Sequence, residues 1–136
     1  MTDNPLEKCL AAFARDKNGD NYVRLLYAFR YTDVLVTEAL PDGELPLFGN
    51  QGIVPNRRFV PDIISYAGKM LMPVYSDAGE IPANRPTGKA VYMHCRDWIK
   101  ASRQKKTDGV VLNPFSKLSF ILTRDQIKVL LSFPEV

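Results

Sequence analysis

Two apolar runs interrupted by an Asn-Pro pair constrain the fold of this chain more than any other feature. They lie in the stretch DGVVLNPFSKLSFIL, and the first of them is Val110–Leu112. A continuous apolar run bounded by turn-forming residues is typical of a strand that is buried on both faces. We therefore expect a central strand here, a turn at Asn113 and Pro114, and a neighbouring strand formed by Leu118–Leu122.

Two amphipathic helices are predicted before the first strand. Asn4 suits the cap of the first helix, Pro5 its first position and Glu7 a capping box. The pair Asn18-Gly19 is expected to end this helix, with glycine in a left-handed conformation. Two apolar faces repeat the helical spacing i, i+3, i+4, i+7, and this predicts a helix hairpin with one shared core face. The first face is Leu6, Cys9, Leu10 and Phe13, and the second is Tyr22, Leu25, Leu26 and Phe29.

The pattern changes to strands after the helix hairpin. DVLVTEAL is compact and β-branched, and the runs Ile63–Tyr66 and Met70–Tyr75 flank a tight turn at Ala67-Gly68, as in a β-hairpin. Pro73 cannot donate to a ladder, so its strand is expected at a sheet edge, or with its N–H side facing outward.

The rest of the chain alternates strands and helices. KAVYM predicts a short strand and CRDWIKASRQ a helix, and Thr123 with Gln126 predicts a capping box at the start of a last helix. Together these elements predict one α+β domain over residues 1–136, with the N-terminal helix hairpin packed on a roughly five-stranded mixed sheet and further helices. The Pro/Gly-rich excursion from Pro41 to Arg58 is expected to be its most mobile internal segment.

Charge and cysteine content narrow the class of protein. The net charge is +3, and the segment Arg85–Lys106 supplies it, with 7 Lys/Arg against 1 Asp/Glu. Cys9 and Cys95 lack metal-ligand spacing and are expected to be reduced and mostly buried. No apolar run approaches the roughly 18 residues of a spanning helix, and the N-terminus lacks a signal-peptide pattern, so a cytoplasmic location is expected.

Three segments resemble the N-terminal domain of the SseB family. They are NPLEKCLAAF, MPVYSDAGE and DGVVLNPFS, and the closing LTRDQIKVLL resembles the last helix of that domain. Two features depart from the family pattern: the Pro41–Arg58 excursion is long, and the second domain of many members is not matched here. The resemblance implies a bacterial protein of this fold. The family is tied by name to serine sensitivity and by association to a sulfurtransferase, and the resemblance implies no catalytic residues.

Two surfaces are candidates for recognition. One is formed by Asn113, Pro114 and Phe115 at a sheet end, although Asn113 and Pro114 also suit a plain turn. The other is a basic helix stripe at i, i+4 and i+7, formed by Arg96, Lys100 and Arg103 and extended as far as Lys106. A solvated helix face is the favoured explanation of this stripe, and no aromatic residues are interleaved with it for base stacking.

The sequence favours a binding role over catalysis. The neighbours His94 and Cys95 do not face each other as a nucleophile and base do, and no glycine-rich phosphate motif occurs. We expect a small non-enzymatic interaction domain that binds a protein partner, with no cofactor, no metal and no membrane partner. A nucleic-acid-binding module that uses residues 96–106, and an enzyme of unrecognised type, remain alternatives.

Overall fold

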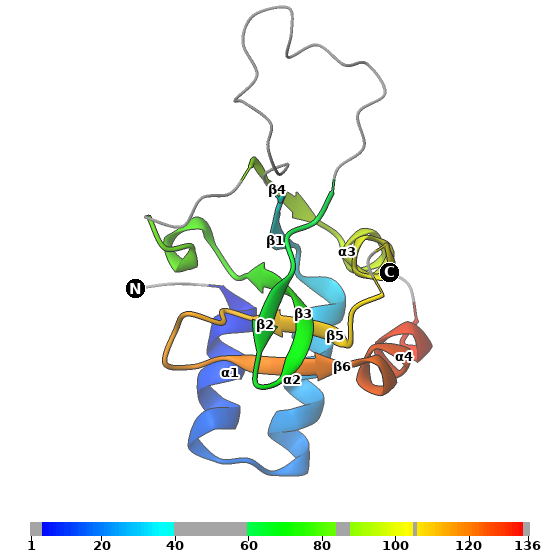
Figure 1. The fold of residues 1–136 in the computed structure, drawn as a ribbon. Coiled ribbons are helices and arrows are strands. Elements are labelled where there is room, and N and C mark those ends of the chain that lie inside the picture. The colour runs from blue at the N-terminus through cyan, green and yellow to red at the C-terminus, as the bar shows by residue number, and fades with distance from the viewer. Residues whose placement is uncertain (1–3, 40–59, 84–87, 105, 135–136) are drawn as a thin grey trace, which may run out of the picture.

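The computed structural model describes residues 4–39, 60–83, 88–104 and 106–134, which form an α+β domain (Figure 1). Its sheet has six strands, against about five expected, in the order β4-β1-β3-β5-β6, with β2 paired to the first half of β3. The elements are α1 (Pro5–Arg15), α2 (Gly19–Tyr31), β1 (Val34–Thr37), β2 (Ile64–Tyr66), β3 (Lys69–Tyr75), the short 3-10 helix η2 (Ala78–Glu80), β4 (Ala90–Met93), α3 (Cys95–Arg103), β5 (Gly109–Leu112), β6 (Phe120–Thr123) and α4 (Arg124–Ser132).

Helices α1 and α2 form the expected hairpin and lie side by side against one face of the sheet (Figure 1). Asn4 caps α1, because its Oδ1 accepts hydrogen bonds from the amides of Leu6 and Glu7. The expected role of Asn18-Gly19 was wrong. Helix α1 ends earlier, with Asp16 as its C-cap, and Asn18 caps the start of α2 by accepting from the amide of Asn21. A side chain that bonds the first free amides favours a helix start over a stop.

Strand β3 lies in the middle of the sheet, so the edge position expected from Pro73 was wrong. β3 pairs in parallel with β5 and antiparallel with β1 and β2. The carbonyl of Val74 accepts from the Asn113 amide on the β5 side, so alternation turns the backbone of Pro73 to the other side of β3. On that side, β3 pairs with β2 as far as Leu71 and with β1 from Val74 onward. Pro73 lies between these two paired segments. The missing N–H therefore faces a gap in the ladder.

The central strand is confirmed. Val110, Val111 and Leu112 are all 0% exposed, and β6 returns antiparallel to β5 as its neighbour. Val110 and Leu112 join the core that α1 and α2 cover, whereas Val111 is buried on the opposite face. The continuous apolar run reflects this burial on both faces.

Several smaller expectations have clear outcomes. The β2–β3 hairpin turns at Ala67 and Gly68, both with positive φ, and Thr123 forms the expected capping box of α4. Cys95 is buried, but Cys9 is only partly buried, because it lies at the margin of the α1 core face.

The Pro41–Arg58 excursion lies outside the described residues. No helix in the described ranges is long and apolar enough to cross a membrane.

Candidate functional site

Asn113 is a buried structural junction at the end of β5. Its side chain is 3% exposed and its backbone is left-handed, with φ of 50°. Its Nδ2 donates to Ser76 Oγ at 3.0 Å, and its Oδ1 accepts from the Ser76 amide at 3.0 Å. Asparagine tolerates this backbone conformation better than most residues do, so Asn113 both turns the chain and bonds the segment after β3.

Ser76 connects this junction to the start of α1. Its Oγ donates to Glu7 Oε2 at 2.6 Å, and its carbonyl accepts from Asn4 Nδ2 at 2.9 Å. The Glu7 carboxylate, expected in a capping box, thus receives the Ser76 hydroxyl. The three segments NPLEKC, MPVYSD and VVLNP therefore meet at one cluster, in which Ser76 and Asn113 are buried and Asn4 and Glu7 are partly buried. We call this cluster the Asn-Ser junction.

The proposed recognition patch at residues 113–115 is divided by this arrangement. Asn113 and Pro114 are buried, whereas the Phe115 side chain is 49% exposed. Asn113 and Pro114 are therefore largely withdrawn from solvent, and Phe115 is the member of the three whose side chain lies at the surface.

The basic stripe is exposed as expected. Arg96, Lys100 and Arg103 lie on the solvent side of α3, while Trp98 on the same helix is 0% exposed. Lys105, within the extension of this stripe, lies outside the described residues. Arg124, the first residue of α4, lies near the end of α3. Burial and the neighbouring charge of Arg103 lower the pKa of Arg124.

His94 and Cys95 have structural positions at the start of α3. His94 is the N-cap, and its Nδ1 accepts from the Arg96 amide at 3.4 Å. The Cys95 side chain is 1% exposed, and burial raises its pKa to about 11, although Arg30 opposes the shift. A thiol with this pKa stays protonated at neutral pH, which disfavours nucleophilic chemistry.

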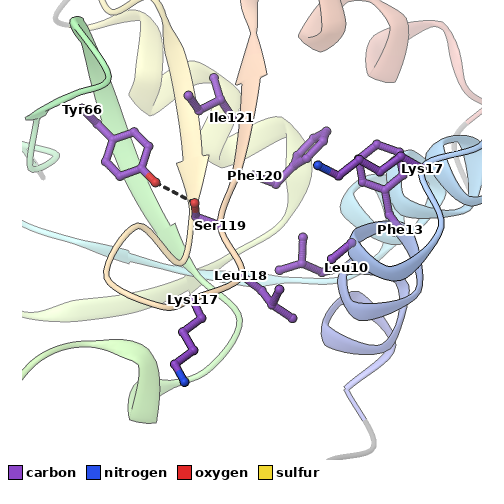
Figure 2. A pocket seen from close by; sticks show the side chains of 10 residues that line it. Leu10, Phe13, Lys17, Tyr66, Lys117, Leu118, Ser119, Phe120 and Ile121 are labelled. Atoms are coloured by element: carbon purple, nitrogen blue, oxygen red, sulfur yellow. Dashed lines mark hydrogen bonds between the residues drawn. The ribbon is translucent and has the colours of Figure 1, made fainter.

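A hollow lies between α1 and the edge of β6. Its volume is about 400 Å³, and it is lined by Leu10, Phe13, Ala14, Lys17, Tyr66, Lys117, Leu118, Ser119, Phe120 and Ile121 (Figure 2). We call it the α1–β6 groove. Most of its lining is apolar, and its charged members are the exposed lysines Lys17 and Lys117.

Aromatic packing and one hydrogen bond hold the walls of the groove. The rings of Phe13 and Phe120 meet edge to face at 5.8 Å, which fixes Phe120 against α1. On the other wall, the hydroxyls of Tyr66 and Ser119 are 2.6 Å apart and share a hydrogen bond (Figure 2). The groove is therefore built from residues with defined positions and is not a gap between loose side chains.

A second hollow of about 320 Å³ borders the first. The two share Leu10 and Leu118, and the second also contains Glu7, Glu80 and Asn113. Oxygens of Glu7, Asp77 and Glu80 lie within 4.8 Å of one another, close enough to hold a hard cation. However, Glu7 accepts the Ser76 hydroxyl and Asp77 caps η2 through the Gly79 amide, so two of the three carboxylates already have structural roles.

Sequence reasoning missed the α1–β6 groove. The sequence pattern places Phe13 on the core face of a helix and Leu118 in a strand, and Lys17 belongs to no motif. The groove exists because β6 begins at Phe120, which leaves Leu118 in the loop with a side chain 39% exposed. Only the antiparallel return of β6 brings these residues beside α1, and a single sequence does not give strand order.

A family model matches residues 6–128, and its description is SseB protein N-terminal domain. The chain belongs to the SseB family. In this SseB domain, the three segments that carry the resemblance meet at the Asn-Ser junction, and its members Glu7, Ser76 and Asn113 lie within the matched residues. The comparison with curated proteins and the comparison with solved structures gave no match.

Proposed function

We propose that this SseB domain is a non-enzymatic protein-binding domain whose binding surface is the α1–β6 groove. The observation that supports it is an apolar hollow of about 400 Å³ that carries two exposed lysines. Peptide-binding surfaces combine apolar pockets with charged rims, and the charges steer and select the partner. Lys17 and Lys117 therefore favour a partner segment with apolar anchors and acidic flanks.

The exposed leucine in the groove is the central apolar contact of this proposal. Leu118 borders both hollows, and its side chain is 39% exposed. A partner side chain that covers Leu118 removes apolar surface from water, at about 25 cal/mol for each Å² buried.

Selection from a displayed library of 12-residue peptides tests this role. We expect enriched peptides to alternate apolar residues with Asp or Glu. Leu118→Asp is expected to weaken their binding at least about tenfold, because it places a charge in the apolar contact. Val129→Asp is the matched control, since Val129 is an exposed apolar residue on α4, 43% exposed and outside the groove lining.

Two results contradict the proposal. One is a library that yields no enriched peptide. The other is an equal change in peptide affinity for Leu118→Asp and Val129→Asp. Both variants must keep the circular dichroism spectrum of the wild type for this result to count.

Nucleic-acid binding through α3 is the second candidate. Arg96, Lys100 and Arg103 are all exposed, and Tyr92, in the strand that leads into α3, is 56% exposed. If these cations bind phosphates, the affinity for a duplex or single strand falls steeply with salt, with a slope of about 0.7–0.9 for each phosphate contact. A mobility shift at two salt concentrations, with Arg96→Glu/Lys100→Glu as the variant, tests this. No shift at low salt eliminates the candidate.

A further inference from the structure

β6 is an edge strand of the sheet. In the described part of the chain it pairs with β5 alone, through the register Leu112↔Phe120, Val111↔Ile121 and Val110↔Leu122. Edge strands present backbone donors and acceptors that another chain can pair with. Which groups of β6 face outward follows from the hydrogen bonds of β5.

The backbone of Ile121 faces away from the sheet. The Asn113 amide donates to the Val74 carbonyl at 2.8 Å on the β3 side, so the Leu112 carbonyl, on the same peptide unit, faces β6. Leu112 and Phe120 are therefore a hydrogen-bonded pair, and alternation makes Val111 and Ile121 a non-hydrogen-bonded pair. The N–H and C=O of Ile121 then point to the open edge.

Thr123 supports this assignment independently. Two residues beyond Ile121, its backbone is expected to face outward too. Its amide donates at 2.8 Å to Gln126 Oε1 in the capping box of α4, away from β5. The outward-facing amide of Thr123 is thus already bonded to a side chain, whereas Ile121 is one of the residues that line the α1–β6 groove.

The groove has a wall on each side of this open edge. Phe120 directs its ring toward α1, where it packs on Phe13, so Ile121 directs its side chain to the opposite face. Tyr66 stands on that opposite side and bonds Ser119, as Figure 2 shows. A strand laid along β6 would therefore place successive side chains alternately against α1 and against Tyr66.

The charges favour a partner over a second copy of this chain. Lys17 and Lys117 line the groove beside the open edge, and both are exposed. A second copy of β6 would carry its own Lys117 and would add positive charge along the edge, whereas an acidic peptide neutralises the ammonium groups of Lys17 and Lys117. Edge lysines are a common protection against self-association.

We infer that the partner binds by strand addition: an extended acidic segment pairs its backbone with the N–H and C=O of Ile121 and places alternate side chains on the two walls of the α1–β6 groove. This inference rests on the proposed function and specifies its mode of binding. Main-chain hydrogen bonds supply affinity in this mode, and the pockets for alternate side chains supply specificity.

Backbone methylation of a selected peptide tests the pairing. In a series of peptides that carry one N-methyl group each, the amide that donates to Ile121 loses a hydrogen bond and clashes with β6. We expect the affinity to fall roughly tenfold or more there and to change less at the two adjacent positions, since their amides point away. Amide hydrogen exchange gives a second readout: saturating peptide should slow exchange at Ile121 and leave Thr123, already bonded to Gln126, little changed.

The outcomes separate the mode of binding from the function. Suppose that the peptide binds through the groove, every N-methyl group lowers the affinity equally, and amide exchange at Ile121 is not slowed. This result overturns strand addition and leaves the protein-binding proposal in place. Dimerisation of the Lys17→Gln/Lys117→Gln variant through β6, with no peptide bound by the wild type, overturns both and assigns the lysines to protection of the edge.

Discussion

Asn113 and Ser76 exchange two hydrogen bonds, each 3.0 Å long, between the end of β5 and the residue that follows β3. The same serine donates to Glu7 at the start of α1. The two parallel central strands and the first helix are thus joined at one cluster, whose centre, Ser76 and Asn113, is buried. Satisfied polar groups in a buried cluster specify a single arrangement, because leaving any member unpaired is costly.

Asn113→Ala should destabilise the domain by about 2–3 kcal/mol. The substitution removes both side-chain bonds, leaves the Ser76 amide without its partner and places alanine at a φ of 50°. Chemical denaturation measures the change in the free energy of unfolding. Ser76→Ala and the double variant complete a cycle, and we expect a coupling of about 1 kcal/mol or more between the two residues. A loss below about 0.5 kcal/mol would contradict the structural role.

The sequence alone predicted the turn at Asn113 but did not predict the long-range hydrogen bonds of its side chain. From the Asn-Pro pattern, asparagine is expected to bond the turn that follows it. In the structure its side chain bonds Ser76, which is 37 residues away in the sequence, because the parallel pairing of β3 and β5 brings their ends together. A contact of this kind depends on strand order, which local patterns do not carry.

Gly109→Ala should be among the most damaging single substitutions. Gly109 has a φ of 144°, and a Cβ there would overlap the carbonyl oxygen of Leu122. We expect a loss of about 3 kcal/mol or more, or failure to fold. Gly19→Ala is the control, since Gly19 is the first residue of α2 with nothing within 4 Å of its Cβ position, and the substitution should change the stability little. Thermal denaturation compares the two, and equal effects would contradict the packing at Gly109.

Val111→Ala should cost about 1–3 kcal/mol, because it leaves a cavity in the buried face of β5 opposite the helices. Val111 is 0% exposed, whereas Val129 on α4 is 43% exposed, so Val129→Ala makes the same deletion at the surface and should change little. Urea denaturation of both variants measures the difference. Similar values would show that this face of the sheet is not packed as described.

Cys95 should make the domain less stable as the pH rises from 9 to 11. Its pKa is about 11 in the folded protein against 9.0 ordinarily, because burial disfavours the thiolate. Between these values the unfolded chain binds fewer protons than the folded chain, so the free energy of unfolding falls as pH rises. A Cys95→Ala variant should show a weaker fall, by urea denaturation at pH 8.5 to 10.5. Identical pH dependence in the two proteins would contradict the shift.

Thiol labelling at pH 8 gives a related prediction. Cys9 is partly buried and should react with a thiol reagent in the native protein, whereas Cys95 should react only after unfolding. Single-cysteine variants assign the two rates. Fast labelling at Cys95 in a folded Cys9→Ala variant would show that the start of α3 opens readily.

Local patterns predicted elements well and surfaces poorly. The apolar spacing of α1 and α2 and the run Val110–Leu112 report burial, which is a property of each segment, and both predictions are confirmed. The edge position expected from Pro73 was wrong, because its missing N–H faces a gap between two partner strands inside the sheet, and local alternation does not show which strands those are. The α1–β6 groove was missed because α1 contributes Phe13 and Lys17 whereas the loop before β6 contributes Lys117 and Leu118, more than 90 residues later.

Chemical-shift mapping with a selected acidic peptide tests the central claim most directly, because it reports every backbone amide that the peptide contacts. We predict that the largest changes on titration fall on Leu10–Lys17, Tyr66 and Lys117–Ile121, the residues around the α1–β6 groove. Changes concentrated on Arg96–Arg103 of α3, with the groove unaffected, would contradict the account and assign the binding surface to the basic stripe.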